Sequence, residues 1–103
     1  KLYMHHRIDE NQELYEELVG TFKALANEDR LKILALLKEN TEMSAQEVEQ
    51  HFYLEQSTTS HHLNTLRRAG ITQCRKKGRH VYYSINYQSF LALIDEFKGE
   101  LKK

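Results

Sequence analysis

Two short helices joined by a tight turn are the feature that most limits how this chain can fold. Residues 44–47 form a capping box, in which the Ser44 hydroxyl accepts from the Glu47 amide and the Glu47 carboxylate accepts from the Ser44 amide. This box predicts a helix from residue 45 to about 52. A second helix is predicted over residues 56–69, because Gly70 is a typical helix stop. Two helices about three or four residues apart are the arrangement of a helix-turn-helix.

Apolar residues at helical spacing predict three further helices. The first runs from about residue 9 to 26, and the second is a central core helix that begins after the N-cap residue Asn27 and is apolar over more than half its circumference. The last helix lies within residues 87–103 and is capped by Asn86. Its apolar stripe needs a partner surface, so we expect this segment to be a dimerisation helix.

A β-hairpin is predicted between the second short helix and the last helix. Residues 71–75 and 80–85 are rich in β-formers and flank a cationic tip, Lys76, Lys77, Gly78 and Arg79, where Gly78 can supply a positive φ. The fold class is therefore mainly α with a β-hairpin (α+β). A length of 103 residues suits a single domain, and we expect residues 1–8 to be flexible.

Charge is segregated along a chain whose formal net charge is zero. Residues 56–94 hold six Lys and Arg and no Asp or Glu, whereas residues 1–55 hold twelve acids and six bases. A block of one sign is typical of a surface that binds a polyanion, because each neutralised phosphate releases condensed counterions. A solvated basic surface would explain the cations but not the absence of acids.

The second short helix has one face suited to DNA. Thr59, Leu63 and Leu66 share the side expected to pack on the core, and the opposite side offers donors and acceptors without a carboxylate. An ordinary surface helix would mix Glu with Lys. We expect His61 to contact DNA and its neighbour His62 to be a hydrogen-bonded structural residue. The predicted DNA contacts on this helix and the hairpin are Gln56, Ser57, Thr58, Ser60, His61, Asn64, Thr65, Arg68, Arg75, Lys76, Lys77 and Arg79.

Three motifs of this sequence, in this order, resemble the ArsR/SmtB family of winged-helix repressors. They are FKALANEDRLKIL at 22–34, QSTTSHHL at 56–63 and GRHVYYS at 78–84. The resemblance implies a winged helix-turn-helix with residues 56–69 as recognition helix and the hairpin as wing. It also implies a homodimer that occupies double-stranded operator DNA until an inducer binds. The dimer would form through the first and last helices, with Leu14, Leu18, Phe90, Leu93, Ile94, Phe97 and Leu101 as candidate dimerisation residues.

The sequence departs from this family where metal ligands usually stand. Many members carry cysteines where this chain has Ser44 and Gln46, so the soft thiolate ligands are missing. At the zinc-type positions Tyr87, Ser89 and Lys103 replace donors and leave Glu100 alone. We therefore predict no metal or other cofactor at the usual family sites and leave the inducer open.

Two features keep a metal- or redox-responsive repressor open as an alternative. His5 and His6 could supply imidazole ligands, although a disordered pair is the simpler interpretation. Cys74 lies beside Arg75 and Lys76 and could be a redox-sensing thiol, although a small residue packed on the hairpin is simpler.

Other classes of protein fit the sequence less well. We expect no enzyme, because the sequence lacks the common nucleophile, nucleotide and metalloprotease motifs. No apolar run approaches the ~20 residues of a membrane span, and a lone cysteine fits a reducing compartment, so we expect a cytoplasmic protein. A winged-helix module that docks an acidic protein remains the rival to a DNA-binding regulator.

Overall fold

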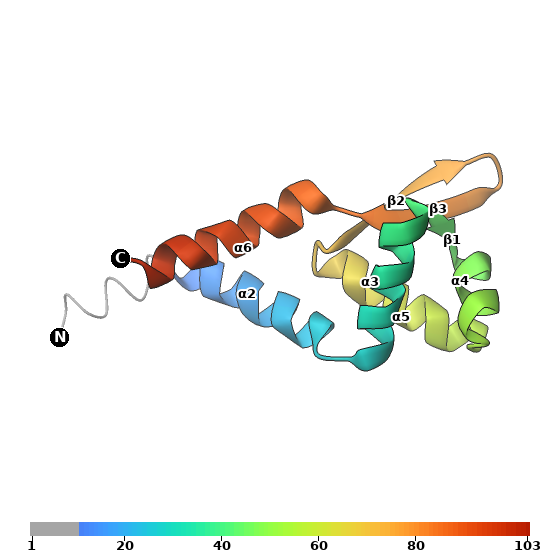
Figure 1. The fold of residues 1–103 in the computed structure, drawn as a ribbon, viewed down its shortest axis with the longest axis horizontal. Coiled ribbons are helices and arrows are strands. Elements are labelled where there is room, and N and C mark those ends of the chain that lie inside the picture. The colour runs from blue at the N-terminus through green and yellow to red at the C-terminus, as the bar shows by residue number, and fades with distance from the viewer. Residues whose placement is uncertain (1–10) are drawn as a thin grey trace.

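The computed structural model describes residues 11–103 as five helices and three strands (Figure 1). The expected flexibility of residues 1–8 and the predicted helix start near residue 9 lie outside this range. The elements in chain order are α2 (Gln12–Leu25), α3 (Glu28–Asn40), β1 (Met43–Ser44), α4 (Ala45–Phe52), α5 (Gln56–Arg68), β2 (Thr72–Lys77), β3 (His80–Ile85) and α6 (Tyr87–Leu101). The predicted winged helix-turn-helix is confirmed, with α4 and α5 as its two short helices.

Side-chain caps define three helix starts, as the sequence predicts. The Asn27 side chain accepts from the Arg30 amide at 3.0 Å, and the Asn86 side chain accepts from the Ser89 amide at 3.2 Å. Both bonds of the capping box form at α4, from the Glu47 amide to Ser44 Oγ at 3.2 Å and from the Ser44 amide to Glu47 Oε1 at 2.9 Å. Each cap satisfies amides that have no partner within the helix.

The hairpin is tighter than predicted. Lys77 pairs with His80, so only Gly78 and Arg79 form the loop, and Gly78 has a φ of 64°. A positive φ at the first of two loop residues matches a type II′ turn, whose twist suits the flanking strands. The prediction of a four-residue cationic tip was wrong in this respect, because Lys76 and Lys77 belong to β2.

A third strand joins the hairpin, which the sequence analysis missed. In β1, Met43 pairs with Tyr83 and Ser44 pairs with Tyr82, giving an antiparallel sheet of order β1-β3-β2. The strand has two residues, too few for an alternating pattern, and it exists because β3 presents a free edge beside the start of α4.

The core lies between α3, α4 and α5, beneath the sheet. Ile33, Leu37, Val48, Leu63 and Leu66 are fully buried there. Helix α3 contributes one face rather than more than half its circumference, because Leu31 is 51% exposed. The core therefore fixes α5 in place and leaves its opposite face to solvent.

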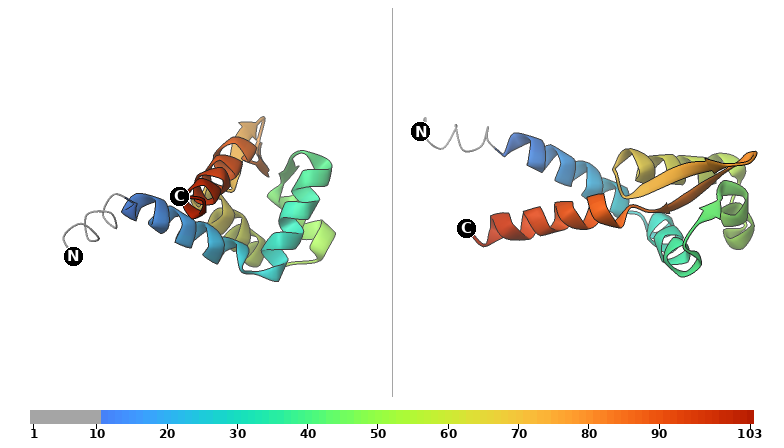
Figure 2. Two further views of the ribbon diagram at one scale, coloured as in Figure 1. Left: turned by 60° about the vertical axis from the view of Figure 1, so that its left-hand side comes forward. Right: turned by 90° about the horizontal axis from the view of Figure 1, so that it is seen from above.

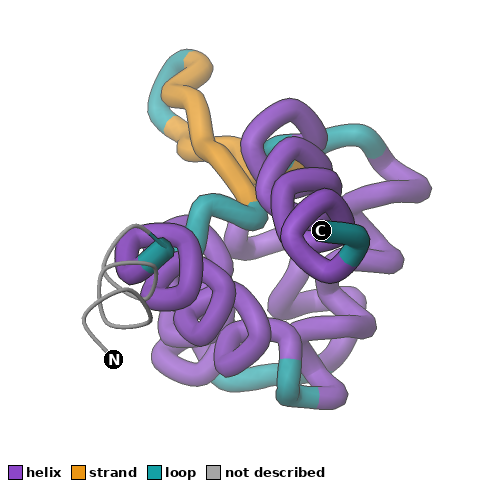
Figure 3. The backbone as a smooth tube through the Cα atoms, turned by 90° about the vertical axis from the view of Figure 1, so that its left-hand side faces the viewer, coloured by secondary structure: helices purple, strands orange, loops and turns teal. Residues whose placement is uncertain are grey.

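Helices α2 and α6 extend away from the helix-turn-helix end of the molecule (Figures 1 and 2). An end-on view shows them as two separate columns, with the hairpin projecting to one side (Figure 3). They touch through Phe22 and Phe97, whose rings meet edge to face at 5.7 Å between centroids. None of the described helices combines the length and apolar character that a membrane crossing requires.

Candidate nucleic-acid interface

Helix α5 is divided into a packed side and a free side. Thr59, His62, Leu63 and Leu66 are buried, which confirms the predicted packed side. None of the candidate DNA contacts is buried. Gln56, Ser57, His61, Arg68 and the four hairpin cations are exposed, and Thr58, Ser60, Asn64 and Thr65 are half-buried.

The free side of α5 and the neighbouring hairpin form a surface rich in cations. Helix α5 contains no carboxylate, and its last turn carries Arg67 and Arg68, both exposed. Arg67 was not among the candidate contacts, although it belongs to the same acid-free block and that signal could have included it. A helix without acids beside a basic hairpin favours a polyanionic partner.

Arg75 on β2 is held by a carboxylate from outside the block. Its Nε donates to Glu42 Oε2 at 2.9 Å and its Nη2 to Glu42 Oε1 at 2.7 Å. This bidentate pair lowers the pKa of the Glu42 carboxyl below its usual value, chiefly through the hydrogen bond from Arg75. Arg75 thus joins the hairpin to the residue that precedes β1, whereas no ion pair is seen for Arg79 in residues 11–103.

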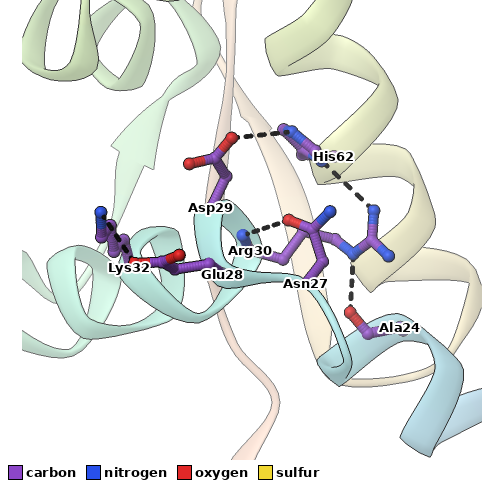
Figure 4. Close-up of polar contacts among 7 residues, drawn as sticks. All are labelled: Ala24, Asn27, Glu28, Asp29, Arg30, Lys32 and His62. Atoms are coloured by element: carbon purple, nitrogen blue, oxygen red, sulfur yellow. Dashed lines mark hydrogen bonds and ion pairs between the residues drawn. The ribbon is translucent and has the colours of Figure 1, made fainter.

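Arg30 connects α5 to the corner between α2 and α3 (Figure 4). Its Nε donates to the Ala24 carbonyl at 2.6 Å, at the end of α2, and its Nη1 donates to His62 Nδ1 at 3.3 Å. The His62 Nε2 atom faces Asp29 Oδ2 at 4.0 Å. One guanidinium therefore touches the last turn of α2 and the middle of α5.

His62 is suited to this place as a neutral imidazole. Because arginine can only donate, Nδ1 must accept, and the ring proton then sits on Nε2 toward Asp29. Burial lowers the pKa of His62 below its usual value, and the charge of Arg30 lowers it further. The prediction that His62 is a hydrogen-bonded structural residue is confirmed, while its neighbour His61 is exposed.

The candidate dimerisation residues divide into two groups. Leu18 and Leu93 are already buried within one chain, Leu14, Phe90, Ile94 and Phe97 are half-buried, and Leu101 is exposed. A second apolar stripe on the same two helices is more open to solvent. It comprises Tyr15, Val19, Phe22, Tyr87 and Leu91. The spacing of Tyr15, Val19 and Phe22 at i, i+4 and i+7 is the signal that could have found it.

The possible sensor residues are only partly described. Cys74 is exposed on β2, so the expectation that it packs on the hairpin was wrong. Within residues 11–103, no three or more His, Cys, Asp or Glu side chains gather in a way that could hold a metal ion. The His5 and His6 pair lies outside the described residues.

Comparisons with known proteins agree with this geometry. The family described as "Bacterial regulatory protein, arsR family" matches residues 27–73. The transcriptional repressor SdpR of Bacillus subtilis is 42% identical over 67 residues, which cover 65% of this chain and 73% of SdpR. The transcriptional activator HlyU of Vibrio cholerae is 40% identical over 77 residues, which cover 75% of this chain and 70% of HlyU.

Solved structures show the same arrangement of elements. The structure of HlyU from Vibrio cholerae aligns with a TM-score of 0.66 over 86% of this chain and 96% of that chain. Mb0332 from Mycobacterium bovis, described as a homodimeric winged helix-turn-helix DNA-binding domain, aligns with a TM-score of 0.75 at 26% identity. That alignment covers 91% of this chain and 86% of the Mb0332 chain.

Proposed function

Because this chain belongs to the arsR family of bacterial regulatory proteins and is a transcriptional regulator, we propose that it is a homodimeric repressor of the winged helix-turn-helix type. In this proposal the chain is a single domain, α5 lies in the major groove of an operator, and the β2–β3 hairpin contacts the flanking backbone. Helix α6 together with α2 forms the dimer. Two α5 helices then read half-sites about 10–10.5 bp apart, or a multiple of that spacing, in a roughly palindromic site.

The observation that carries this proposal is the free side of α5. It presents Ser57, His61 and Arg68 to solvent with no carboxylate on the helix, and the packed side is anchored in the core. Hydroxyl and imidazole groups can read base edges, and the arginine near the helix end can grip a phosphate. A module that docks an acidic protein would use the same charge but needs no groove-sized spacing of two helices.

The relatives differ in role, since SdpR is a transcriptional repressor and HlyU a transcriptional activator. We favour repression by similarity to SdpR, and the direction of regulation has its own test. Occupation of a promoter blocks transcription, and binding of an inducer outside the usual family metal sites would release the DNA. The relatives are transcriptional regulators, and we propose no catalytic activity and no cofactor.

The test begins with a duplex selected by the wild-type protein from a random-sequence library. We expect the selected site to be palindromic and the complex to withstand heparin. His61→Ala should weaken binding to the selected duplex by about 1–3 kcal/mol and leave binding to a scrambled duplex nearly unchanged, because a base contact is lost. The selected site placed over a promoter should lower transcription in vitro when the protein is added.

Three results would contradict the proposal. Selection that yields no enriched duplex would remove sequence-specific DNA binding. Equal losses for His61→Ala on both duplexes would remove base reading by this residue. Increased transcription from the same promoter would make the protein an activator.

A further inference from the structure

The turn between α4 and α5 demands a left-handed residue, and the chain places a tyrosine there. The Leu54 amide donates to the Glu49 carbonyl at 3.2 Å, which closes the end of α4 as in a Schellman motif. Tyr53 accordingly has φ 55° and ψ 34°. Glycine is the usual residue at such a position because a Cβ is disfavoured there.

No contact of the Tyr53 side chain with the rest of the described chain offsets the cost of this backbone conformation. The residue is 94% exposed, and within residues 11–103 its side chain makes no hydrogen bond, ring stacking or cation contact, although its backbone amide donates to the Glu49 carbonyl. A large ring is therefore held in solvent at a backbone position that resists side chains. Backbone outliers that persist without local compensation are concentrated at functional sites.

We propose that the Tyr53 hydroxyl donates a hydrogen bond to a DNA phosphate beside the N-terminus of α5, in each half of the dimer. This inference rests on the proposed DNA-binding function and adds a contact outside the acid-free block. Tyr53 is the C-cap residue of α4, in the turn of the helix-turn-helix, and only Leu54 and Glu55 separate it from the helix whose free side is proposed to face the groove. Tyrosine hydroxyls are among the regular donors to DNA phosphates.

The charge of the turn explains why a long, neutral side chain such as tyrosine is suited to donate to the phosphate. Glu55, the N-cap residue of α5, is exposed and forms no side-chain cap. Its negatively charged carboxylate repels a phosphate placed directly at the N-terminus of α5. The tyrosine ring extends its hydroxyl away from the backbone and carries no charge that Glu55 would neutralise. A neutral donor to a phosphate contributes affinity without reading sequence and without releasing counterions.

The experiment uses the full chain and the duplex selected by the wild type, together with a scrambled duplex. Binding is measured by fluorescence anisotropy over a salt series for the wild type, Tyr53→Phe and Tyr53→Gly. Tyr53→Phe removes only the hydroxyl, and Tyr53→Gly removes the side chain while suiting the left-handed backbone. Thr41→Gly is the matched control, because Thr41 is exposed and is the one other non-glycine residue with positive φ in residues 11–103, at 68°.

Both Tyr53 variants should bind about 100-fold more weakly on both duplexes, because each variant dimer loses two charge-assisted hydrogen bonds worth about tenfold apiece. Their salt slopes should match the wild type, because no cation is lost. Thr41→Gly should bind as the wild type does. Thermal melting of Tyr53→Gly should match or exceed that of the wild type, which shows that the affinity loss is not a folding defect.

Wild-type affinity in Tyr53→Phe would overturn the proposal, whether or not Tyr53→Gly is weakened, because the hydroxyl would then make no contact. A loss confined to the selected duplex would also overturn it, since a phosphate contact does not depend on sequence. If the wild type itself selects no duplex, the proposed function fails. If the wild type binds and the Tyr53 variants bind equally well, only this inference fails.

Discussion

The two arginines of the hairpin have the same charge but different surroundings. Arg75 is held by both oxygens of Glu42, whereas Arg79 lies in the two-residue loop, with no ion pair seen in the described part of the chain. A paired arginine must give up its partner, or share it, to neutralise a phosphate. Arg75 is therefore better placed to orient the hairpin than to hold DNA.

This difference predicts unequal salt dependence. Arg79→Ala should lower affinity on selected and scrambled duplexes and reduce the slope of log K against log salt by about one unit per half-site. Arg75→Ala should reduce the slope by less, because Glu42 already neutralises its charge. Anisotropy titrations at several salt concentrations provide both slopes, and equal changes in the two variants would show that Arg75 leaves Glu42 to contact DNA.

At the scale of elements, helix α5 is held against its neighbours by a partly buried polar contact as well as by apolar packing. The bond from Arg30 to the neutral His62 ring fixes α5 against the α2–α3 corner. Protonation of His62 would turn an acceptor into a donor and place a cation opposite the guanidinium. The contact between Arg30 and His62 is therefore sensitive to pH, although the negative charge of Asp29 partly offsets the repulsion.

Stability should fall in acid because of this contact. The pKa of His62 is lower in the folded chain than its usual value near 6.5, so the folded state binds fewer protons than the unfolded state. The contribution is complete above pH 6.5 and is lost as pH falls from 6.5 through the lowered folded-state pKa. Urea unfolding across this window should show a smaller free energy of unfolding at lower pH.

Two substitutions identify the source of that pH dependence. His62→Gln should make the free energy of unfolding less dependent on pH below 6.5, because the glutamine amide does not titrate. His51→Gln is the matched control and should leave the pH dependence unchanged, since His51 is exposed on α4 and is not among the groups that shift the pKa of His62. If His62→Gln shows the same pH dependence of unfolding as the wild type, another group causes the loss of stability in acid.

At the scale of the whole molecule, the two helices that extend from the helix-turn-helix end are incompletely covered. Val19 on α2 and Leu91 on α6 are each about half exposed, and the α2–α6 contact through Phe22 and Phe97 leaves both open. Large exposed apolar side chains repeated along two neighbouring helices are typical of an interface. The proposed homodimer would cover them and bring two α5 helices into one assembly.

Leu91→Asp should therefore shift the protein from dimer to monomer in sedimentation equilibrium. The monomer should lose operator affinity by about 100-fold or more, because two linked readers gain from effective concentration. Leu31→Asp is the matched control, since Leu31 is exposed to nearly the same extent, at 51% against 50%, but lies on α3. An intact dimer in Leu91→Asp would place the interface elsewhere.

The sequence by itself determined the features that depend on residues within one or two helical turns. The caps at Asn27, Ser44 and Asn86 each join a side chain to an amide three residues away, so their patterns are visible in the sequence. The packed side of α5 followed from helical periodicity, and the acid-free block was a matter of composition. The winged helix-turn-helix and the character of its free surface could therefore be predicted.

Only the tertiary structure decided the features that join distant residues. Glu42 finds Arg75 across 33 positions, β1 pairs with β3, and Arg30 reaches His62 across 32 positions. Helical spacing also could not show that Leu18 is buried within one chain while Val19 is left open. The physical reason is that a helical stripe states which residues share a face, whereas packing between elements decides which part of that face meets a neighbour and which part meets water.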